Sequence, residues 1–211
     1  MEVQFAVSKI SKWASRESGD TLEMIERPQG GLSMVLVDGQ TSGRSAKAIS
    51  NIVARKAVQL LGEGVRDGAA ARAAHDYLFT FRGGKVSATL NILSVDTRTR
   101  TIVISRNNES PVLVHTAADG FYQLDEESKA VGVHRNTKPV ITEIPIEVGT
   151  IVVAFTDGLR HAGTLSGKGC SYDPYAALQG MVMAGQCDAA SICDRLLDGA
   201  IALGDFVLID A

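Results

Sequence analysis

The stretch GGLSMVLVDGQTSGRSAKAIS, residues 30–50, decides the fold. Its segment Leu32–Val37 carries no charge and one hydroxyl, which is typical of a strand buried in a sheet. The apolar run ends abruptly at Asp38 and Gly39, and a short polar turn follows. Further along, TIVVAFTDGLRHAG at residues 150–163 ends an apolar run in the same way, at Asp157 and Gly158.

Composition restricts the class of protein. A chain of 211 residues suits one domain, 1–211, and the hydrophobic and charged fractions of 45% and 21% are those of an ordinary globular protein. The formal net charge of -3, with no long basic run, argues against nucleic acid or a membrane surface as partner. No membrane-spanning stretch or signal peptide is evident. Three cysteines without metal-site spacing predict free thiols and a cytoplasmic location.

The order of the expected elements predicts an α+β fold. Strands come in meanders and helices in two pairs, unlike the regular alternation of a parallel α/β sheet. Two mostly antiparallel sheets facing each other, with a helix pair on each outer side, would use every element. The expected strands are residues 3–10, 21–26, 32–37, 87–96, 101–107, 111–116, 121–124, 139–146, 150–156 and 206–210. The expected helices are residues 44–61, with Ala48, Ile49, Ile52, Val53, Val58 and Leu61 as its buried stripe, and residues 68–81, a helix from Asp173-Pro174, and residues 188–203.

Asp-Gly occurs five times, so the dipeptide alone predicts nothing. Asp119-Gly120 is most simply a hairpin turn, Asp67-Gly68 an inter-helix loop, and Asp198-Gly199 a bend or end of the last helix. Asp38 and Asp157 differ because each ends an apolar strand, where partial desolvation of a carboxylate costs free energy. A divalent metal would remove the repulsion between two such ends, although two unrelated strand ends remain the alternative.

Two further aspartates lie at strand edges. Asp20 leads directly into a strand after Gly19, and Asp205 precedes the closing strand. Four aspartates without a partnering His or Cys cluster favour a hard, oxygen-preferring ion such as Mg²⁺ or Mn²⁺. Two such ions about 4 Å apart would share a water, lower its pKa and direct it at phosphorus.

In chain order, the motifs are Gly19-Asp20, Asp38-Gly39, Ser87-Ala88-Thr89, Asn107 to Pro111, Thr156-Asp157-Gly158 and a closing Gly-Asp before a strand. Together they resemble the metal-dependent type 2C (PPM) protein serine/threonine phosphatases, and most closely their bacterial SpoIIE/RsbX-like branch. The resemblance covers nearly the whole chain and implies a four-layer αββα sandwich.

The resemblance also implies a role for each acid. Asp38 would bridge two divalent ions, Mn²⁺ or Mg²⁺, and the Gly39 carbonyl would bind one of them. Asp157 and Asp205 would hold the other ion, and Asp20 would hold metal-bound water or lie just outside the ligands. A metal-bridging hydroxide would then attack phosphoserine or phosphothreonine. Members of this branch act on STAS-domain anti-sigma antagonists or stressosome proteins, which implies a role in signal transduction and stress response.

The sequence departs from this family at three places. The branch carries a Gly-His-Gly turn where this chain has Gln40-Thr41-Ser42-Gly43. The phosphate-binding arginine of eukaryotic relatives has no clear counterpart; Arg16 is the candidate, and an exposed structural arginine is the alternative. Instead of adjacent aspartates before the final strand there is only Gly204-Asp205. Either Asp205 still reaches the metal, or loop residues are missing, or one ion site is lost.

Other classes of protein fit less well. A haloacid-dehalogenase-like phosphatase needs a second acid two residues after its aspartate, where this chain has Gln40. An N-terminal-nucleophile hydrolase needs a Ser, Thr or Cys at the processed N-terminus, which Met1-Glu2-Val3 does not offer. The histidines His75, His115, His134 and His161 are interpreted as surface or helix-start residues, and a role near the site is the alternative for His161, four residues after Asp157. The remaining alternative is a pseudophosphatase that binds its partner without catalysis.

Overall fold

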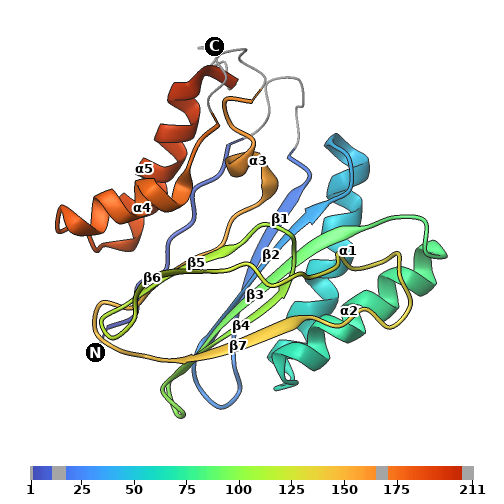
Figure 1. The fold of residues 1–211 in the computed structure, drawn as a ribbon. Helices are drawn as coiled ribbons and strands as arrows, with labels where there is room; N and C mark the ends of the chain where they lie inside the picture. Colours follow the sequence, from blue (N-terminus) through green and yellow to red (C-terminus); the bar gives the residue numbers. More distant parts are fainter. Residues whose placement is uncertain (1, 11–17, 165–170, 206–211) are drawn as a thin grey trace. The chain divides into compact units, whose positions relative to one another are not determined.

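The computed structural model describes residues 2–10, 18–164 and 171–205, which form two compact units. The larger unit lies within residues 17–111 and 125–146, and the smaller within residues 1–16, 112–124 and 147–211. The elements are labelled in Figure 1. In the larger unit they are β1 (Asp20–Glu26), β2 (Leu32–Gly39), α1 (Gly43–Gly62), α2 (Asp67–Arg82), β3 (Ala88–Asp96), β4 (Thr101–Asn107) and β7 (Val140–Pro145). In the smaller unit they are β5 (Val112–Thr116), β6 (Gly120–Leu124), β8 (Ile151–Val153), α3 (Asp157–Arg160), α4 (Pro174–Met183), α5 (Ala189–Ala200) and a π-helix (Ile201–Asp205).

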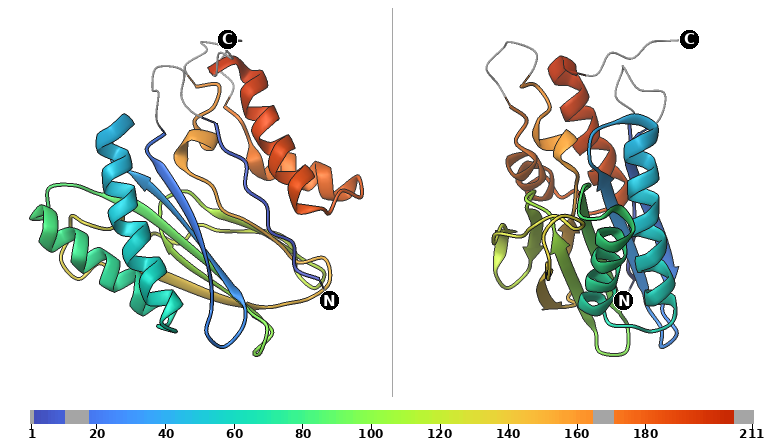
Figure 2. Two further views of the ribbon diagram at one scale, coloured as in Figure 1. Left: turned by 180° about the vertical axis from the view of Figure 1, so that it is seen from behind. Right: turned by 90° about the vertical axis from the view of Figure 1, so that its right-hand side faces the viewer.

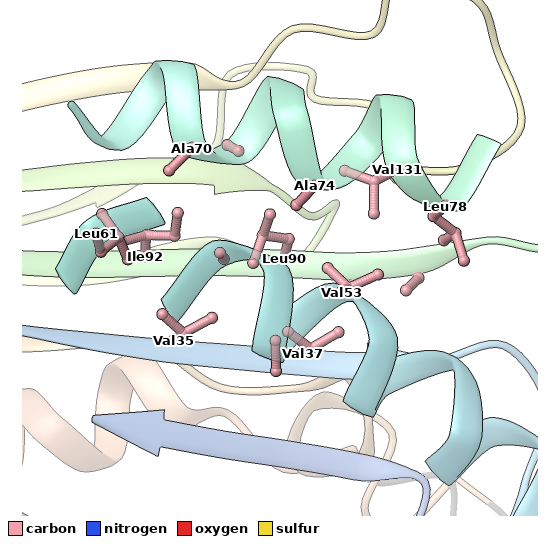
Figure 3. Packing of buried hydrophobic residues seen from close by; sticks show 14 of the residues in the cluster. Val35, Val37, Val53, Leu61, Ala70, Ala74, Leu78, Leu90, Ile92 and Val131 are labelled. Atoms are coloured by element: carbon pink, nitrogen blue, oxygen red, sulfur yellow. The ribbon is translucent and has the colours of Figure 1, made fainter. Parts of the chain in front are cut away.

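The larger unit is an antiparallel sheet covered on one face by α1 and α2. Its strand order is β1-β2-β3-β4-β7, and every neighbouring pair is antiparallel. Figures 2 and 3 show both helices against the sheet, with aliphatic side chains filling the space between them. The buried cluster includes Val35 and Val37 of β2, Leu90 of β3, Val53 of α1 and Leu78 of α2. This apolar layer fixes which face of the sheet points away from the helices.

Strand β2 alternates between its two faces rather than being uniformly buried. Ser33, Val35 and Val37 are fully buried on the helix side, whereas Met34, Leu36 and Asp38 are half-buried. Successive strand residues point to opposite faces. The Asp38 side chain therefore projects from the face that the helices do not cover.

Helix α1 is present as predicted, but its buried stripe is shifted. The buried residues are Ala46, Ile49, Ser50, Val53, Ala54, Ala57 and Leu61. Ala48 is exposed, so the expected stripe was wrong at this position, whereas Ile52 and Val58 are partly buried and pack against the core. Small residues at 46, 50, 54 and 57 let the helix lie close to the sheet, and the stripe follows that close contact rather than the bulkiest side chains.

The smaller unit has a three-stranded antiparallel sheet of order β6-β5-β8 and the helices α3, α4 and α5. Its core joins Leu113 of β5 to Leu178 of α4 and Leu196 of α5. The predicted start of α4 is confirmed, because the Asp173 side chain accepts hydrogen bonds from Tyr175 N and Ala176 N at 3.0 and 3.1 Å. The last α-helix ends at Ala200 and continues as the π-helix, without a bend at Gly199.

The predicted strand at residues 3–10 is wrong. Among the described residues this segment pairs with no strand, and it contacts α5 through single hydrogen bonds. Ser8 Oγ donates to Asp194 Oδ1 at 2.5 Å, and Ala189 N donates to Gln4 Oε1 at 3.2 Å. Alternation of apolar residues alone was therefore not enough to predict a strand here. The expected strand at residues 206–210 lies outside the described residues.

Asp67 is a buried helix residue and not, as expected, part of an inter-helix loop. It opens α2 with 6% of its surface exposed, and it accepts a short hydrogen bond from Ser94 Oγ. Arg27 Nη1 lies 3.6 Å from Asp67 Oδ2 and 3.4 Å from Ser33 Oγ, and Ser33 and Ser94 are joined at 2.6 Å. The Asp67 carboxylate therefore connects α2 to β3 through Ser94 and to the β1–β2 connection through Arg27.

His75 also corrects the expectation of a surface or helix-start position. It lies in the middle of α2 with 1% of its surface exposed, and its Nδ1 accepts a hydrogen bond from Gly132 N at 2.9 Å. An acceptor Nδ1 requires the neutral ring with its proton on Nε2. Burial lowers the pKa of His75 below 6.5, and the neighbouring Asp76 carboxylate partly opposes this shift.

The α+β class with two antiparallel sheets is confirmed. Among the described residues, no helix has both the length and the apolar character needed to cross a membrane.

Asp67→Ala should lower the free energy of unfolding by about 2 to 4 kcal/mol, because it leaves the buried Ser94 hydroxyl and the Arg27 guanidinium without their acceptor. Urea denaturation would measure this change. The matched control is Glu63→Ala, an exposed acid of the same unit, which should change stability by less than about 0.5 kcal/mol. Equal effects of the two substitutions would contradict the structural role of Asp67.

Stability should fall as the pH drops below about 6.5, because unfolded His75 then binds a proton that the folded protein excludes. The loss attributable to this residue is at most about 1.4 kcal/mol per pH unit. Urea denaturation at pH 7.5 and 5.5 should show a smaller drop for His75→Gln than for the unaltered protein. An identical drop in both would mean that His75 does not titrate differently on unfolding.

Candidate metal site at the strand ends

Two of the predicted acids face each other at one end of the larger sheet. Asp20 of β1 pairs with Asp38 of β2 in the antiparallel register, and Asp38 in turn pairs with Thr89 of β3. Residues directly opposite in an antiparallel pair project from the same face, with Cβ atoms about 5 Å apart. Asp20, Asp38 and Thr89 thus form a row across three strands, on the face away from α1 and α2.

This pair of carboxylates fits a divalent ion. Both aspartates are half-buried, and like charges directly opposite each other in a sheet destabilise it. A cation between them removes that repulsion. Carboxylate and carbonyl oxygens without nitrogen or sulfur are the ligands preferred by Mg²⁺ and Mn²⁺. The oxygens that the strand ends supply therefore suit the predicted ion.

Gly39 is required by packing against α1. A Cβ at this position would overlap the carbonyl oxygen of Ala46, and one at Gly19 would lie 2.7 Å from the Ala46 Cβ. Three small residues thus let the first turn of α1 rest on the strand ends beside the acids. The absence of a Cβ at Gly39 therefore lets the strand end approach the backbone of α1 closely.

The turn that replaces Gly-His-Gly is held by two hydrogen bonds between Gln40 and Ser87, one of which is made by the Gln40 side chain. Gln40 N donates to Ser87 O at 3.0 Å, and Ser87 N donates to Gln40 Oε1 at 2.9 Å. Thr41 has a φ of 79°, a left-handed conformation uncommon for threonine. Ser42 then begins α1 as its N-cap residue without a side-chain capping bond. Gln40 therefore ties the end of β2 to the start of β3.

Lys47 is a residue near the acids that sequence reasoning missed. Its Nζ donates to the backbone carbonyl of Asp20 at 2.7 Å and to Thr21 Oγ1 at 2.9 Å. Thr21 is buried on the helix side, where it also contacts Ser50 Oγ at 2.7 Å and Asn51 Oδ1 at 2.8 Å. A signal existed in the sequence, since Lys47, Ser50 and Asn51 follow one another at helical spacing and form a polar face on the helix.

The remaining predicted site residues belong to other parts of the chain. Asp157 is the exposed first residue of α3 in the smaller unit, and its carbonyl accepts from His161 N at 2.9 Å. Asp205 is the last residue of the π-helix. Arg16 lies outside the described residues. Within the part of the chain that the structure describes, no group of three or more His, Cys, Asp or Glu side chains is placed to hold a metal ion.

The Asn107 to Pro111 motif has a structural role in the larger unit. Asn107 Nδ2 donates to the carbonyls of Lys129 and Lys138, at 2.9 and 3.2 Å. The buried Arg106 donates to Asn108 O at 2.8 Å and to Glu126 O. Burial lowers the pKa of Arg106, and Asp125 and Glu126 counteract this shift. These side chains hold the irregular segment before β7.

Comparison with known families identifies the chain's relatives. The family model described as Stage II sporulation protein E (SpoIIE) matches residues 28–210. A search of curated proteins found no match.

Several solved structures share the fold at low sequence identity. The PP2C phosphatase domain of SpoIIE with a regulatory fragment, from Bacillus subtilis, has a TM-score of 0.72 at 16% identity, over 88% of this chain and 53% of that one. The RsbU and RsbW domains of Rv1364c from Mycobacterium tuberculosis have a TM-score of 0.68 at 18% identity, and the match covers 90% of this chain and 52% of that one. The chain thus spans about half the length of these two. RsbX in complex with magnesium has a TM-score of 0.68 at 14% identity, and the match covers 92% of this chain and 84% of that one. The PstP catalytic domain in complex with two manganese ions has a TM-score of 0.64 at 14% identity, and the match covers 90% of this chain and 87% of that one.

These likenesses confirm the αββα sandwich as the fold class of the chain. They also show that Mg²⁺ and Mn²⁺ occur in matching structures.

Gly39→Ala should destabilise the protein by about 1 to 3 kcal/mol, because the added methyl group meets the backbone of α1 and not a side chain that can turn away. Thermal unfolding would measure the change. The matched control is Gly180→Ala in α4, where the added methyl meets nothing within 4 Å and alanine is the better helix former. If Gly39→Ala were as stable as Gly180→Ala, the close contact between Gly39 and the α1 backbone would be disproved.

Proposed function

Because the chain belongs to the SpoIIE family, we propose that it is a metal-dependent protein phosphatase that hydrolyses phosphoserine or phosphothreonine on a signalling protein. The structural neighbours are PP2C serine/threonine phosphatases, metal-dependent hydrolases of phosphoproteins, so the predicted enzyme class is confirmed at the level of the family.

The observation that carries the proposal is the register of β1 and β2, which sets Asp20 opposite Asp38. Carboxylate oxygens that face each other at a strand end are ligands of the kind that Mg²⁺ and Mn²⁺ prefer, so this arrangement favours a site for a divalent cation. The surrounding contacts support the same reading. The small residues at 39 and 46 and the Gln40–Ser87 pairing hold the strand ends in place without metal.

The proposed roles of the residues follow from their oxygens. Asp38 and the Gly39 carbonyl would bind divalent ions, Mn²⁺ or Mg²⁺, and Asp157 and Asp205 are proposed as further ligands. Asp20 would orient water beside Asp38, and Arg16 would bind the substrate phosphate. When bound, two divalent ions supply charge neutralisation at phosphate oxygens and activation of water at neutral pH. The carboxylates would hold the ions in a fixed position relative to the bound phosphoserine or phosphothreonine.

The proposed substrate is a STAS-domain regulator, such as an anti-sigma antagonist or a stressosome protein, in the cytoplasm. One matching structure joins an RsbU domain to an RsbW domain, and another is described with the bacterial stressosome. The formal net charge of -3 disfavours nucleic acid and membrane surfaces as partners. The free thiols of Cys187 and Cys193 suit a reducing compartment.

A second candidate function is a pseudophosphatase that binds its partner and does not turn it over. The observation favouring it is the closing Gly204-Asp205, which has one aspartate where the family carries two. Such a protein would bind its phosphorylated partner and one ion or none.

Hydrolysis of a generic aryl phosphate tests the proposal directly. The purified protein should turn the substrate over with Mn²⁺ or Mg²⁺ and not with chelator. Asp38→Asn should reduce kcat by more than about 100-fold, because even residues outside the ligand set change activity 10- to 100-fold. The control is Asp119→Asn, the exposed acid of a hairpin Asp-Gly turn, which should retain full activity.

Turnover that survives chelation or Asp38→Asn would exclude the two-metal mechanism. A folded protein that binds Mn²⁺ but shows no turnover on aryl phosphate or on a phosphorylated STAS-domain protein would instead establish the pseudophosphatase.

A further inference from the structure

Lys47 reaches the candidate metal site from behind. Asp20 lies on β1, which is an edge strand of the sheet formed by the described residues. The Lys47 Nζ donates to the Asp20 carbonyl at 2.7 Å, and so supplies that residue with a charged hydrogen-bond donor from α1. The Asp20 side chain projects from the opposite face of the same strand, beside Asp38.

The hydrogen bonds of this tether have a fixed direction. The ammonium group donates to Thr21 Oγ1 at 2.9 Å, and the Thr21 hydroxyl donates to Asn51 Oδ1 at 2.8 Å, because a side-chain amide oxygen only accepts. Ser50, which is fully buried, lies 2.7 Å from the same hydroxyl and 3.1 Å from the Lys47 carbonyl. The start of β1 is therefore joined to two successive turns of α1 through Thr21.

We propose that Lys47 is a positioning residue for the metal site: its ammonium group holds the Asp20 backbone so that the Asp20 carboxylate stays opposite Asp38. This inference rests on the proposed function. Charged hydrogen bonds are short and about twice as strong as neutral ones, which suits a tether at a strand end that two carboxylates would otherwise push apart. Residues that orient metal ligands from behind typically change metal affinity 10- to 100-fold when they are removed.

The alternative roles of Lys47 make different predictions. If its charge acted only through long-range repulsion of the incoming cation, its removal would tighten metal binding. If it served only to attach α1 to the sheet, its removal would lower the melting temperature and leave the metal affinity of the folded protein unchanged. A positioning role weakens metal binding in a protein that is still folded.

Titration calorimetry of Mn²⁺ into the metal-free full chain distinguishes these roles. Lys47→Met should raise the Kd about 10- to 100-fold, and Lys47→Arg, which keeps the charge and the donors, should stay within about threefold of the unaltered protein. Lys56→Met is the matched control, since it removes the same charge from the same helix at a position over the Tyr77 ring. It should leave the Kd unchanged.

Thr21→Val provides a second route if Lys47→Met does not fold. It removes the hydroxyl acceptor and nearly preserves the shape of the side chain, and it should raise the Kd severalfold. An unchanged or lower Kd for Lys47→Met, or for Thr21→Val where only that variant folds, would overturn the proposal while leaving the proposed function intact. No Mn²⁺ binding by the unaltered protein, with no hydrolysis, would instead overturn the proposed function and this inference with it.

Discussion

The candidate site depends on the antiparallel register between β1 and β2. This register places two carboxylates, Asp20 and Asp38, opposite each other at the end of a sheet whose other face is filled with aliphatic side chains. A shift of one residue would send either side chain to the helix-covered face. The register is set by the tight connection between the strands, where Arg27 N donates to Gly31 O and Gly30 N donates to Arg27 O, both at 3.0 Å. The electrostatics at one end of the sheet are therefore determined by a turn at the other end.

Polar groups buried in the larger unit hold this sheet to its helices at both ends. Near the β1–β2 turn, the Asp67 carboxylate accepts a hydrogen bond from the Ser94 hydroxyl and lies beside the Arg27 guanidinium. At the opposite end, Lys47 holds the start of β1 through Thr21. Between these two polar groups the contact is aliphatic, as Figure 3 shows, and gives little directional preference. The polar contacts therefore fix the alignment of strands and helices, whereas the apolar contacts supply most of the free energy.

Sequence patterns predicted most elements of the fold because apolar spacing is a local property. They located Asp38 and Asp157 from the places where apolar runs stop, and the α1 helix from its periodicity. They failed where a neighbour distant in sequence decides the outcome. The segment at residues 3–10 alternates like a strand but contacts α5, and Asp67 looks like a loop residue until the strands beneath it are known. The Asp20–Asp38 pairing was readable in principle, by counting outward from the Pro28–Gly31 turn.

The two units differ in how their residues are distributed along the chain. The larger unit draws on one nearly continuous stretch, residues 17–111, with a short return at residues 125–146. The smaller unit combines residues 1–16, 112–124 and 147–211, and its Ser8–Asp194 bond spans 186 positions. Contacts between distant residues form late, because the entropy of closing a long loop must be overcome first. During synthesis on the ribosome, the sheet carrying Asp20 and Asp38 can consequently assemble while the C-terminal helices are still unmade. The N-terminal segment must wait for the last part of the chain to emerge before it finds its partner.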